Sequence, residues 1–169
     1  MTAALPAAFP TTATACFFDT SALVKRYVLE SGTSQVLVLT SSEAPVYIAR
    51  IAAAELVAAL AKKRRMSPAS KQQISRGLRR FRREYNSNAF LVVEIDATLV
   101  DYAMNLAERH ELRGCDSVQL AAVLRANAER LAIDAAGLTL VCADGDLAAA
   151  AQVEGLRVVI PEDVPEDVP

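Results

Sequence analysis

The chain has 169 residues, 53% of them apolar, and a net charge of −2; this length predicts one domain, and no apolar run is long enough to predict a transmembrane helix. Trp is absent, and the single His, His110, excludes two-His zinc motifs and acid–base catalysis by a His pair. Three Cys without metal-type spacing fit reduced thiols in a cytoplasmic protein, so we expect any chemistry to depend on carboxylates.

The first half of the chain alternates short β-rich runs with helical runs. The expected elements are, in order, a strand over 15–18, helices over 22–28 and 33–42, a strand over 46–49, a helix over 51–65 and a helix from 67 to about 85. Thr20 or Ser21 is expected to cap the first of these helices. Pro68 is expected at the first position of the last one, where proline fits a helix.

The second half continues the alternation. Its expected elements are, in order, a strand over 90–95, helices over 96–110 and 116–131, a strand over 138–143, a helix over 146–153 and a strand over 157–160. Asp116 and Gln119 have the spacing of a capping box at the start of the second of these helices.

This order predicts an α/β fold with a mostly parallel central sheet and helices on both faces. The predicted domain covers residues 15–160. The stretch before it, 1–14, is rich in Ala, Thr and Pro and is interpreted as a disordered extension. The stretch after it, 161–169, repeats an acidic, Pro-rich unit and is interpreted as a tail.

Three Asp residues are expected at the carboxyl edge of this sheet, where open parallel sheets bind ligands. Asp19 directly follows one strand, Asp144 closely follows another, and Asp116 opens a helix after Gly114. Each could instead be only a helix N-cap, which is a common use of Asp.

Glu55 is harder to explain as a structural residue. It is the only polar residue among 51–61, and a helix that is apolar on all sides is expected to be buried. A buried carboxylate needs a cation, either a basic side chain such as Arg50 or Lys25, or a bound metal ion.

Converging carboxylates without His or Cys form a site of hard oxygen ligands, which suits Mg²⁺ or Mn²⁺. Such ions catalyse phosphoryl transfer, and a nuclease is the natural enzyme of this kind. The sequence contains neither a P-loop nor a dinucleotide-binding glycine motif nor a serine-hydrolase elbow. His110 is interpreted as a helix-end residue, and Cys16, Cys115 and Cys142 as core residues.

The net charge also conceals a basic segment. From residue 62 to residue 83 the chain carries many Lys and Arg and no acid, which indicates a polyanionic partner. The alternative is a solvated helix face that keeps the protein soluble. The candidate contacts to nucleic acid are Lys62, Lys63, Arg64, Arg65, Arg79 and Arg80.

Four motifs in order resemble the PIN-domain nucleases, and more narrowly the VapC-type toxins of toxin–antitoxin pairs. They are FFDTSALVKRY (17–27), AAELVAAL (53–60), RGCDSVQLAAVL (113–124) and VCADGDLAAAA (141–151). The resemblance extends over residues 15–160. It departs from the family at Cys115, where an aromatic residue is common.

The resemblance implies an Mg²⁺- or Mn²⁺-dependent endoribonuclease that leaves a 5′-phosphate. It also implies a homodimer and inhibition by a small VapB-like antitoxin, for which 51–61 and the neighbouring helix could provide a groove. The implied metal-binding and catalytic residues are Asp19, Glu55, Asp116 and Asp144, with Ser21 and Asp146 in supporting positions. Two alternatives stay open: a housekeeping RNA-processing or flap-type nuclease, and a non-enzymatic α/β module that binds nucleic acid or protein.

Overall fold

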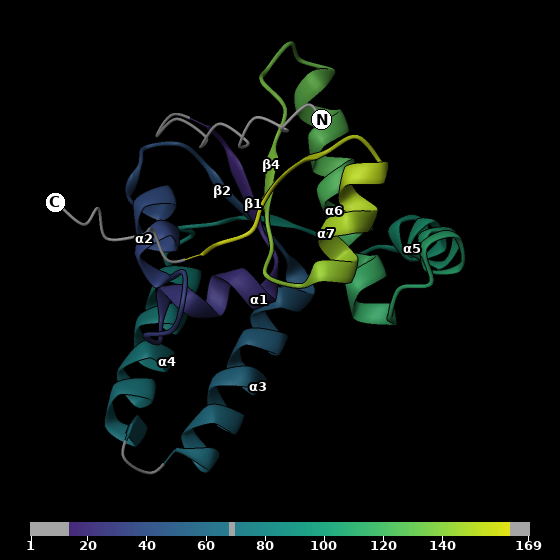
Figure 1. Cartoon of the computed structure of the whole chain (residues 1–169). Coiled ribbons are helices and arrows are strands. Elements are labelled where there is room, and N and C mark those ends of the chain that lie inside the picture. Colours follow the sequence, from purple (N-terminus) through teal and green to yellow (C-terminus); the bar gives the residue numbers. More distant parts are fainter. Residues whose placement is uncertain (1–13, 68–69, 163–169) are drawn as a thin grey trace, which may run out of the picture.

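The computed structural model describes residues 14–67 and 70–162. Its centre is one five-stranded sheet in which every pairing is parallel, with the strand order β3-β2-β1-β4-β5 (Figure 1). The strands are β1 (Cys16–Phe18), β2 (Val46–Ala49), β3 (Leu91–Val93), β4 (Thr139–Val141) and β5 (Arg157–Val159). The predicted α/β class with a parallel sheet is confirmed.

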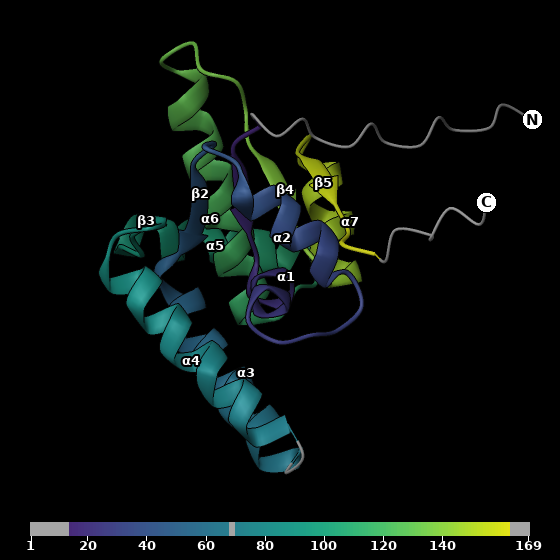
Figure 2. The same cartoon turned by 90° about the vertical axis from the view of Figure 1, so that its left-hand side faces the viewer.

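Helices connect the strands and cover both faces of the sheet, as predicted (Figures 1 and 2). The helical elements are α1 (Thr20–Leu23), η1 (Val24–Arg26), α2 (Thr33–Ser41), α3 (Arg50–Met66), α4 (Lys71–Asn86), α5 (Ala97–His110), α6 (Gly114–Leu131) and α7 (Gly145–Val153). None of the described helices is long and apolar enough to cross a membrane.

The helices divide between two hydrophobic cores, one on each face. Residues of α5, α6 and α7 form one core with Phe17, and residues of α1, η1, α2, α3 and α4 form the other with Phe18. Both phenylalanines are fully buried. Because successive side chains of a strand point to opposite faces, the three residues of β1 contribute to both cores.

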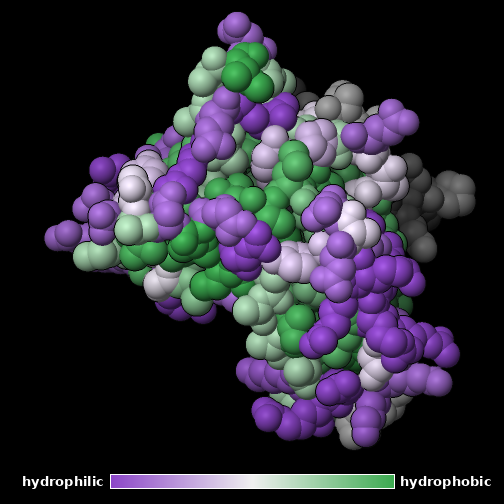
Figure 3. All heavy atoms as spheres, turned by 180° about the vertical axis from the view of Figure 1, so that it is seen from behind, coloured by the Kyte–Doolittle hydropathy of each residue, from purple (hydrophilic) through white to green (hydrophobic). Residues whose placement is uncertain are grey.

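α3 and α4 form a hairpin that extends beyond the carboxyl edge of the sheet (Figures 1 and 2). Its first turns pack on the core through Ala52, Leu56 and Leu60. Seen from behind, hydrophilic residues gather over this part of the molecule, with smaller apolar patches between them (Figure 3). The hairpin therefore carries much of its charge away from the core.

Three local predictions are wrong. The helix expected over 22–28 is the short α1 followed by a 3₁₀ turn, and its cap is Asp19 rather than Thr20 or Ser21. α4 begins at Lys71, later than predicted. Pro68 lies outside the described residues, as do 1–13 of the expected extension and 163–169 of the expected tail.

The predicted capping box at Asp116 is also wrong. α6 begins at Gly114, so Asp116 lies in the first turn of the helix and not before it. The Gln119 side chain does not turn back to the backbone but contacts residues of α1 and α3.

Candidate active site

Asp19 lies where β1 ends and α1 begins, at the carboxyl edge of the sheet. It caps α1, and its Oδ2 accepts hydrogen bonds from the backbone N (2.9 Å) and the Oγ (2.5 Å) of Ser21. The side chain is buried, with 4% of Asp19 exposed. Asp19 is therefore both the cap of α1 and a carboxylate at the edge of the sheet.

Ser21 joins the ends of two neighbouring strands. Its Oγ donates to Asp19 and accepts a hydrogen bond from the backbone N of Ala143 at 2.9 Å, just after β4. Ser21 was predicted to support the site. Its two hydrogen bonds connect Asp19 to the loop that carries Asp144.

Glu55 projects from α3 toward α1 and α6. Its Oε2 accepts hydrogen bonds from Thr20 Oγ1 (2.6 Å) and Gln119 Nε2 (2.9 Å), and Gln119 Nε2 also lies 3.0 Å from Thr20 Oγ1. Three elements thus hold one carboxylate in place.

The alternative of a structural ion pair for Glu55 is wrong. Arg50 pairs with Glu94, and Lys25 pairs with Glu30. The expectation of full burial is also wrong, because Glu55 is half-buried and α3 exposes small residues on its outer side. Neutral donors, rather than a cation, therefore hold Glu55.

Asp116 and Asp144 are bridged by Arg113, which precedes α6. Arg113 donates from Nε to Oδ2 of Asp116 and from Nη2 to Oδ2 of Asp144, at 2.7 Å in each case. Oδ1 of Asp144 accepts the backbone N–H groups of Asp146 and Leu147 at 3.1 Å and so caps α7. The side chain of Asp146 is exposed, and this residue contributes its backbone to the site.

Burial and the neighbouring carboxylates raise the pKa of two of the acids, Asp19 and Asp116. Burial raises the pKa of Asp19 above its ordinary value against the hydrogen bonds from Ser21, and the charge of Glu55 adds to the rise. Burial also raises the pKa of Asp116 against the opposing effect of Arg113, and the charges of Asp144 and Glu55 add to it. Since like charges disfavour each other's ionised forms, a cation among these carboxylates would relieve the repulsion.

The donor set fits a hard divalent ion, because all four acids offer oxygen and no imidazole is near them. Among residues 14–67 and 70–162, no three acidic, His or Cys side chains converge closely enough to hold an ion as they stand. Arg113, with 74% of its side chain exposed, lies between two of the acids, and its movement would free one oxygen of each.

The prediction that all three Cys are core residues is wrong for one of them. Cys16 and Cys142 are buried as expected, but Cys115 is exposed beside Asp116. Burial and the charge of Asp19 raise the pKa of Cys142 to about 12, so this thiol is neutral near the carboxylates and is not an anionic ligand.

The predicted basic residues differ in their surroundings. Arg64 and Arg65 are exposed near the tip of the hairpin, as is Lys62. Lys63 pairs with Glu30 at 2.7 Å, and Arg80 pairs with Glu84 at 2.8 Å. Arg79 lines a separate pocket beside α4.

Comparison with known proteins shows the family of the chain. The family model of the PIN domain matches residues 16–153. Ribonuclease VapC45 and Ribonuclease VapC49, from two strains of Mycobacterium tuberculosis, are each 32% identical over 142 residues, which is 84% of this chain and 92% of the relative. The chain belongs to the VapC-type PIN-domain family.

Solved structures show the same fold. A chain of a toxin–antitoxin complex from Klebsiella pneumoniae superposes with a TM-score of 0.56 and 19% identity, over 88% of this chain and 99% of the other. PAE2754 from Pyrobaculum aerophilum gives a TM-score of 0.50 and 19% identity, over 89% and 87%. At this identity the likeness concerns the fold alone.

The sequence did not indicate three further residues that contact the four acids. Thr20 and Gln119 orient Glu55, and Arg113 bridges two acids. The one signal for Gln119 was a polar side chain directly before the apolar run Leu120–Val123. Polar side chains are uncommon on a buried helix face unless they have a specific partner. Nothing in the sequence pattern distinguished Arg113 from a solvated surface residue.

Proposed function

We propose that this VapC-type protein is an Mg²⁺- or Mn²⁺-dependent endoribonuclease that acts as the toxin of a toxin–antitoxin pair. The strongest support is the gathering of four electrostatically coupled carboxylates at the carboxyl edge of the sheet, from the turn after β1 and from α3, α6 and the turn after β4. The names of the Mycobacterium tuberculosis relatives, both ribonucleases, support RNA as the substrate.

In this proposal Asp19, Asp116 and Asp144 would hold the ion, and Glu55 would either join them or position the attacking water. A bound Mg²⁺ or Mn²⁺ would supply activation of water and neutralisation of charge on the phosphate. Ser21 keeps Asp19 in place through two hydrogen bonds, and burial keeps bulk water from this carboxylate. Arg113, once displaced from the acids, is close enough to them to contact an RNA phosphate.

Thr20 and Gln119 hold Glu55 at its Oε2, and the Cys115 thiol also contacts this carboxylate. These contacts fix the orientation of the Glu55 carboxylate, as is required of a general base that accepts a proton from water. We therefore assign Thr20 and Gln119 as positioning residues for Glu55.

The partners are inferred from chemistry and from the relatives. Basic residues of the α3–α4 hairpin would attract RNA, and the predicted contacts are Lys62, Lys63, Arg64, Arg65, Arg79 and Arg80. A VapB-like antitoxin is supported by the toxin–antitoxin complex that contains the Klebsiella pneumoniae structure. A homodimer and a cytoplasmic location complete the proposal.

Asp19→Asn tests the proposal. Asn keeps the capping oxygen of α1 but removes the charge, so the fold is expected to persist while the cleavage rate falls on the order of 10²-fold or more. Sequencing of RNA 5′-ends after brief expression would show cleavage sites for the wild-type chain and none for the variant.

Asp101→Asn is the matched control, since Asp101 is exposed on α5 and is not among the four acids. Full activity of Asp19→Asn, or of the wild-type chain in excess chelator, would contradict the mechanism. Cleavage that does not arrest growth and is not blocked by a protein encoded beside the gene would instead favour a housekeeping nuclease.

A further inference from the structure

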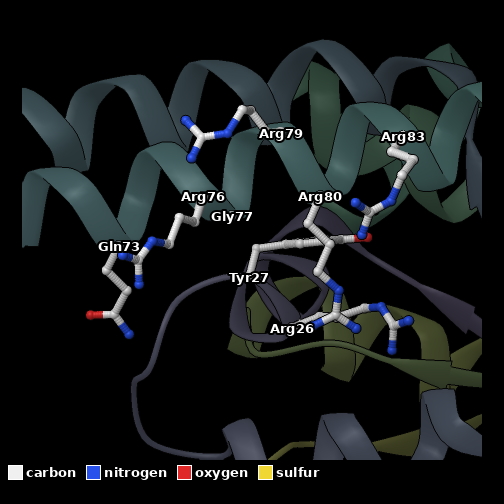
Figure 4. Close-up of a pocket in the computed structure, with 8 residues that line it drawn as sticks. All are labelled: Arg26, Tyr27, Gln73, Arg76, Gly77, Arg79, Arg80 and Arg83. Carbon is white, nitrogen blue, oxygen red and sulfur yellow. The ribbon is translucent and has the colours of Figure 1, made fainter.

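A pocket of about 430 Å³ lies between α4 and the chain that leaves η1 (Figure 4). Five of its lining residues are arginines and none is acidic. The lining residues are Arg26, Tyr27, Gln73, Arg76, Gly77, Arg79, Arg80 and Arg83. The four arginines of α4 recur at about one-turn spacing, so one side of the helix carries them all.

One carboxylate behind the pocket fixes two of these guanidinium groups. Glu84 accepts hydrogen bonds from Arg26 Nε (3.2 Å) and Nη2 (3.3 Å), from Arg80 Nε (2.8 Å) and from the Tyr27 hydroxyl (2.6 Å). Arg26 also donates to Thr40 of α2, and the Arg80 guanidinium lies 5.8 Å from the centre of the Tyr27 ring. Because their positions are fixed before a ligand arrives, binding would cost them little conformational entropy.

The wall of the pocket depends on a close approach of two backbones. A Cβ atom added to Gly77 would lie 2.4 Å from the carbonyl oxygen of Tyr27, which no side chain could tolerate without movement. Gly77 therefore lets α4 lie directly against Tyr27. The pocket is a built feature of the fold and not a chance gap between flexible side chains.

The other three arginines carry uncompensated charge. Within residues 14–67 and 70–162, no carboxylate lies at ion-pair distance from Arg76, Arg79 or Arg83. A guanidinium offers a planar set of donors that matches the oxygens of a phosphate, so several of them around one hollow form a site for an oxyanion.

The pocket is separate from the carboxylate site. Arg26 follows Asp19 by seven residues through α1 and η1, which corresponds to roughly 10–14 Å along the helix axis. Three of the other predicted basic residues line different hollows, Arg64 and Arg65 beside Lys71, and Lys63 beside Glu30. The structure thus selects Arg79 and Arg80 from the predicted group and adds Arg26, Arg76 and Arg83.

We propose that this arginine pocket binds a backbone phosphate of an RNA strand and so anchors the strand at a fixed distance from the carboxylates. The inference rests on the proposed ribonuclease function for the identity of the polyanion. It deepens that function, because an anchor at one to a few nucleotides from the acids would restrict where along a strand cleavage occurs.

The test measures binding of a fluorescently labelled single-stranded RNA in EDTA, where no cleavage occurs. The variant R76Q/R79Q/R83Q removes the three uncompensated charges without touching Glu84 or its partners. We expect its affinity to fall on the order of tenfold, and the slope of log K against log salt to decrease by about 0.7 for each phosphate that the variant no longer neutralises. R76K/R79K/R83K keeps the positive charges but lacks the planar guanidinium groups. Its RNA affinity is expected to lie between that of the wild-type chain and that of R76Q/R79Q/R83Q.

K62Q/R64Q/R65Q is the comparison variant, because it removes three charges from the predicted RNA contacts outside the pocket, and its affinity is expected to fall less than that of R76Q/R79Q/R83Q. An equal loss of affinity in this comparison variant would overturn the pocket in favour of diffuse charge attraction. Unchanged RNA binding by R76Q/R79Q/R83Q would also overturn it. The peptide PEDVPEDVP, which has the sequence of residues 161–169, serves as an acidic probe. If R76Q/R79Q/R83Q binds RNA normally but no longer binds this peptide, the pocket is a site for an acidic protein segment and the RNA proposal is wrong.

Asp19→Asn separates this inference from the proposed reaction. That variant is expected to bind RNA as the wild-type chain does and to fail in cleavage. If Asp19→Asn cleaves normally, the proposed reaction is wrong, whereas the RNA affinity of the arginine variant decides the pocket independently.

Discussion

Arg113 donates a hydrogen bond from Nη2 to Oδ2 of Asp144 at 2.7 Å, across 31 residues of sequence. This contact joins the start of α6 to the start of α7, and the same guanidinium also contacts Asp116. The protein thus places a cation of its own between two of the carboxylates that are proposed to bind metal. The two cations would compete for the same oxygens.

Arg113→Gln tests this competition. Removal of the guanidinium is expected to increase the affinity for Mn²⁺ by a few-fold and to lower the thermal stability without metal, because Asp116 and Asp144 then repel each other without compensation. Thermal unfolding across a Mn²⁺ titration measures both effects. Arg109→Gln is the control, since Arg109 pairs with Glu154 instead. Unchanged or weaker Mn²⁺ binding would exclude a competing role for Arg113.

Gln119→Leu tests the positioning of Glu55. The substitution removes the donor that lies 2.9 Å from Glu55, and we expect the cleavage rate to fall about 10-fold, as for other residues that orient a ligand. Stability should change by less than about 1.5 kcal/mol, because Oε1 of Gln119 is a buried atom without a hydrogen-bond partner among the described residues. Ser117→Ala, on the same helix, is expected to leave the rate unchanged.

Glu84 makes stability depend on pH in the acidic range. Burial raises its pKa, but hydrogen bonds from Tyr27, Arg26 and Arg80 outweigh this and hold the pKa below the ordinary value of 4.5. The unfolded chain then binds the proton more readily than the folded one. The stabilisation is therefore complete above pH 4.5 and is lost as the pH falls through the lowered pKa.

Glu84→Gln is expected to reduce the free energy of unfolding at neutral pH by about 1 kcal/mol, a figure lowered for the partial exposure of the pairs. It should also flatten the fall in stability below pH 4.5. Urea unfolding at several pH values measures both. A variant that loses stability equally at every pH would show that packing, and not charge, is what Glu84 provides.

Cys115 is expected to report on the carboxylates. A hydrogen bond and the charge of Glu55 raise the pKa of this exposed thiol, with burial adding to the rise. Neutralisation of Glu55 by Mn²⁺ would lower that pKa, so alkylation by iodoacetamide should become faster. Mass spectrometry of the native protein should find the label on Cys115 and not on the buried Cys16 or Cys142. A slower reaction with Mn²⁺ would contradict this relation.

The parts of the site that a local pattern encodes were predictable. Asp19 and Asp144 each follow a buried strand, and parallel strands bring their carboxyl ends to one edge. Glu55 was detectable as the one polar residue in an apolar helix. The order and class of the elements followed from the same alternation of short β-rich and longer helical runs.

The contacts between the site residues were not predictable in this way. Thr20 and Glu55 are 35 residues apart, and Gln119 and Glu55 are 64 apart, so only the packing of three helices brings them together. Gln119 had the spacing of a capping box, and the local pattern therefore suggested the wrong partner. The arginine pocket depends in the same way on Tyr27 and α4, which meet only in the folded chain.

The position of Phe17 and Phe18 in the central strand has a mechanical consequence. Each is anchored in a different core, and the next residue along the chain is Asp19. A shift of either layer of helices against the sheet would have to carry β1 with it or break its packing. Asp19 is therefore expected to keep its position when an ion binds. The side chains that move to contact the ion would be those of Glu55, Asp116 and Asp144.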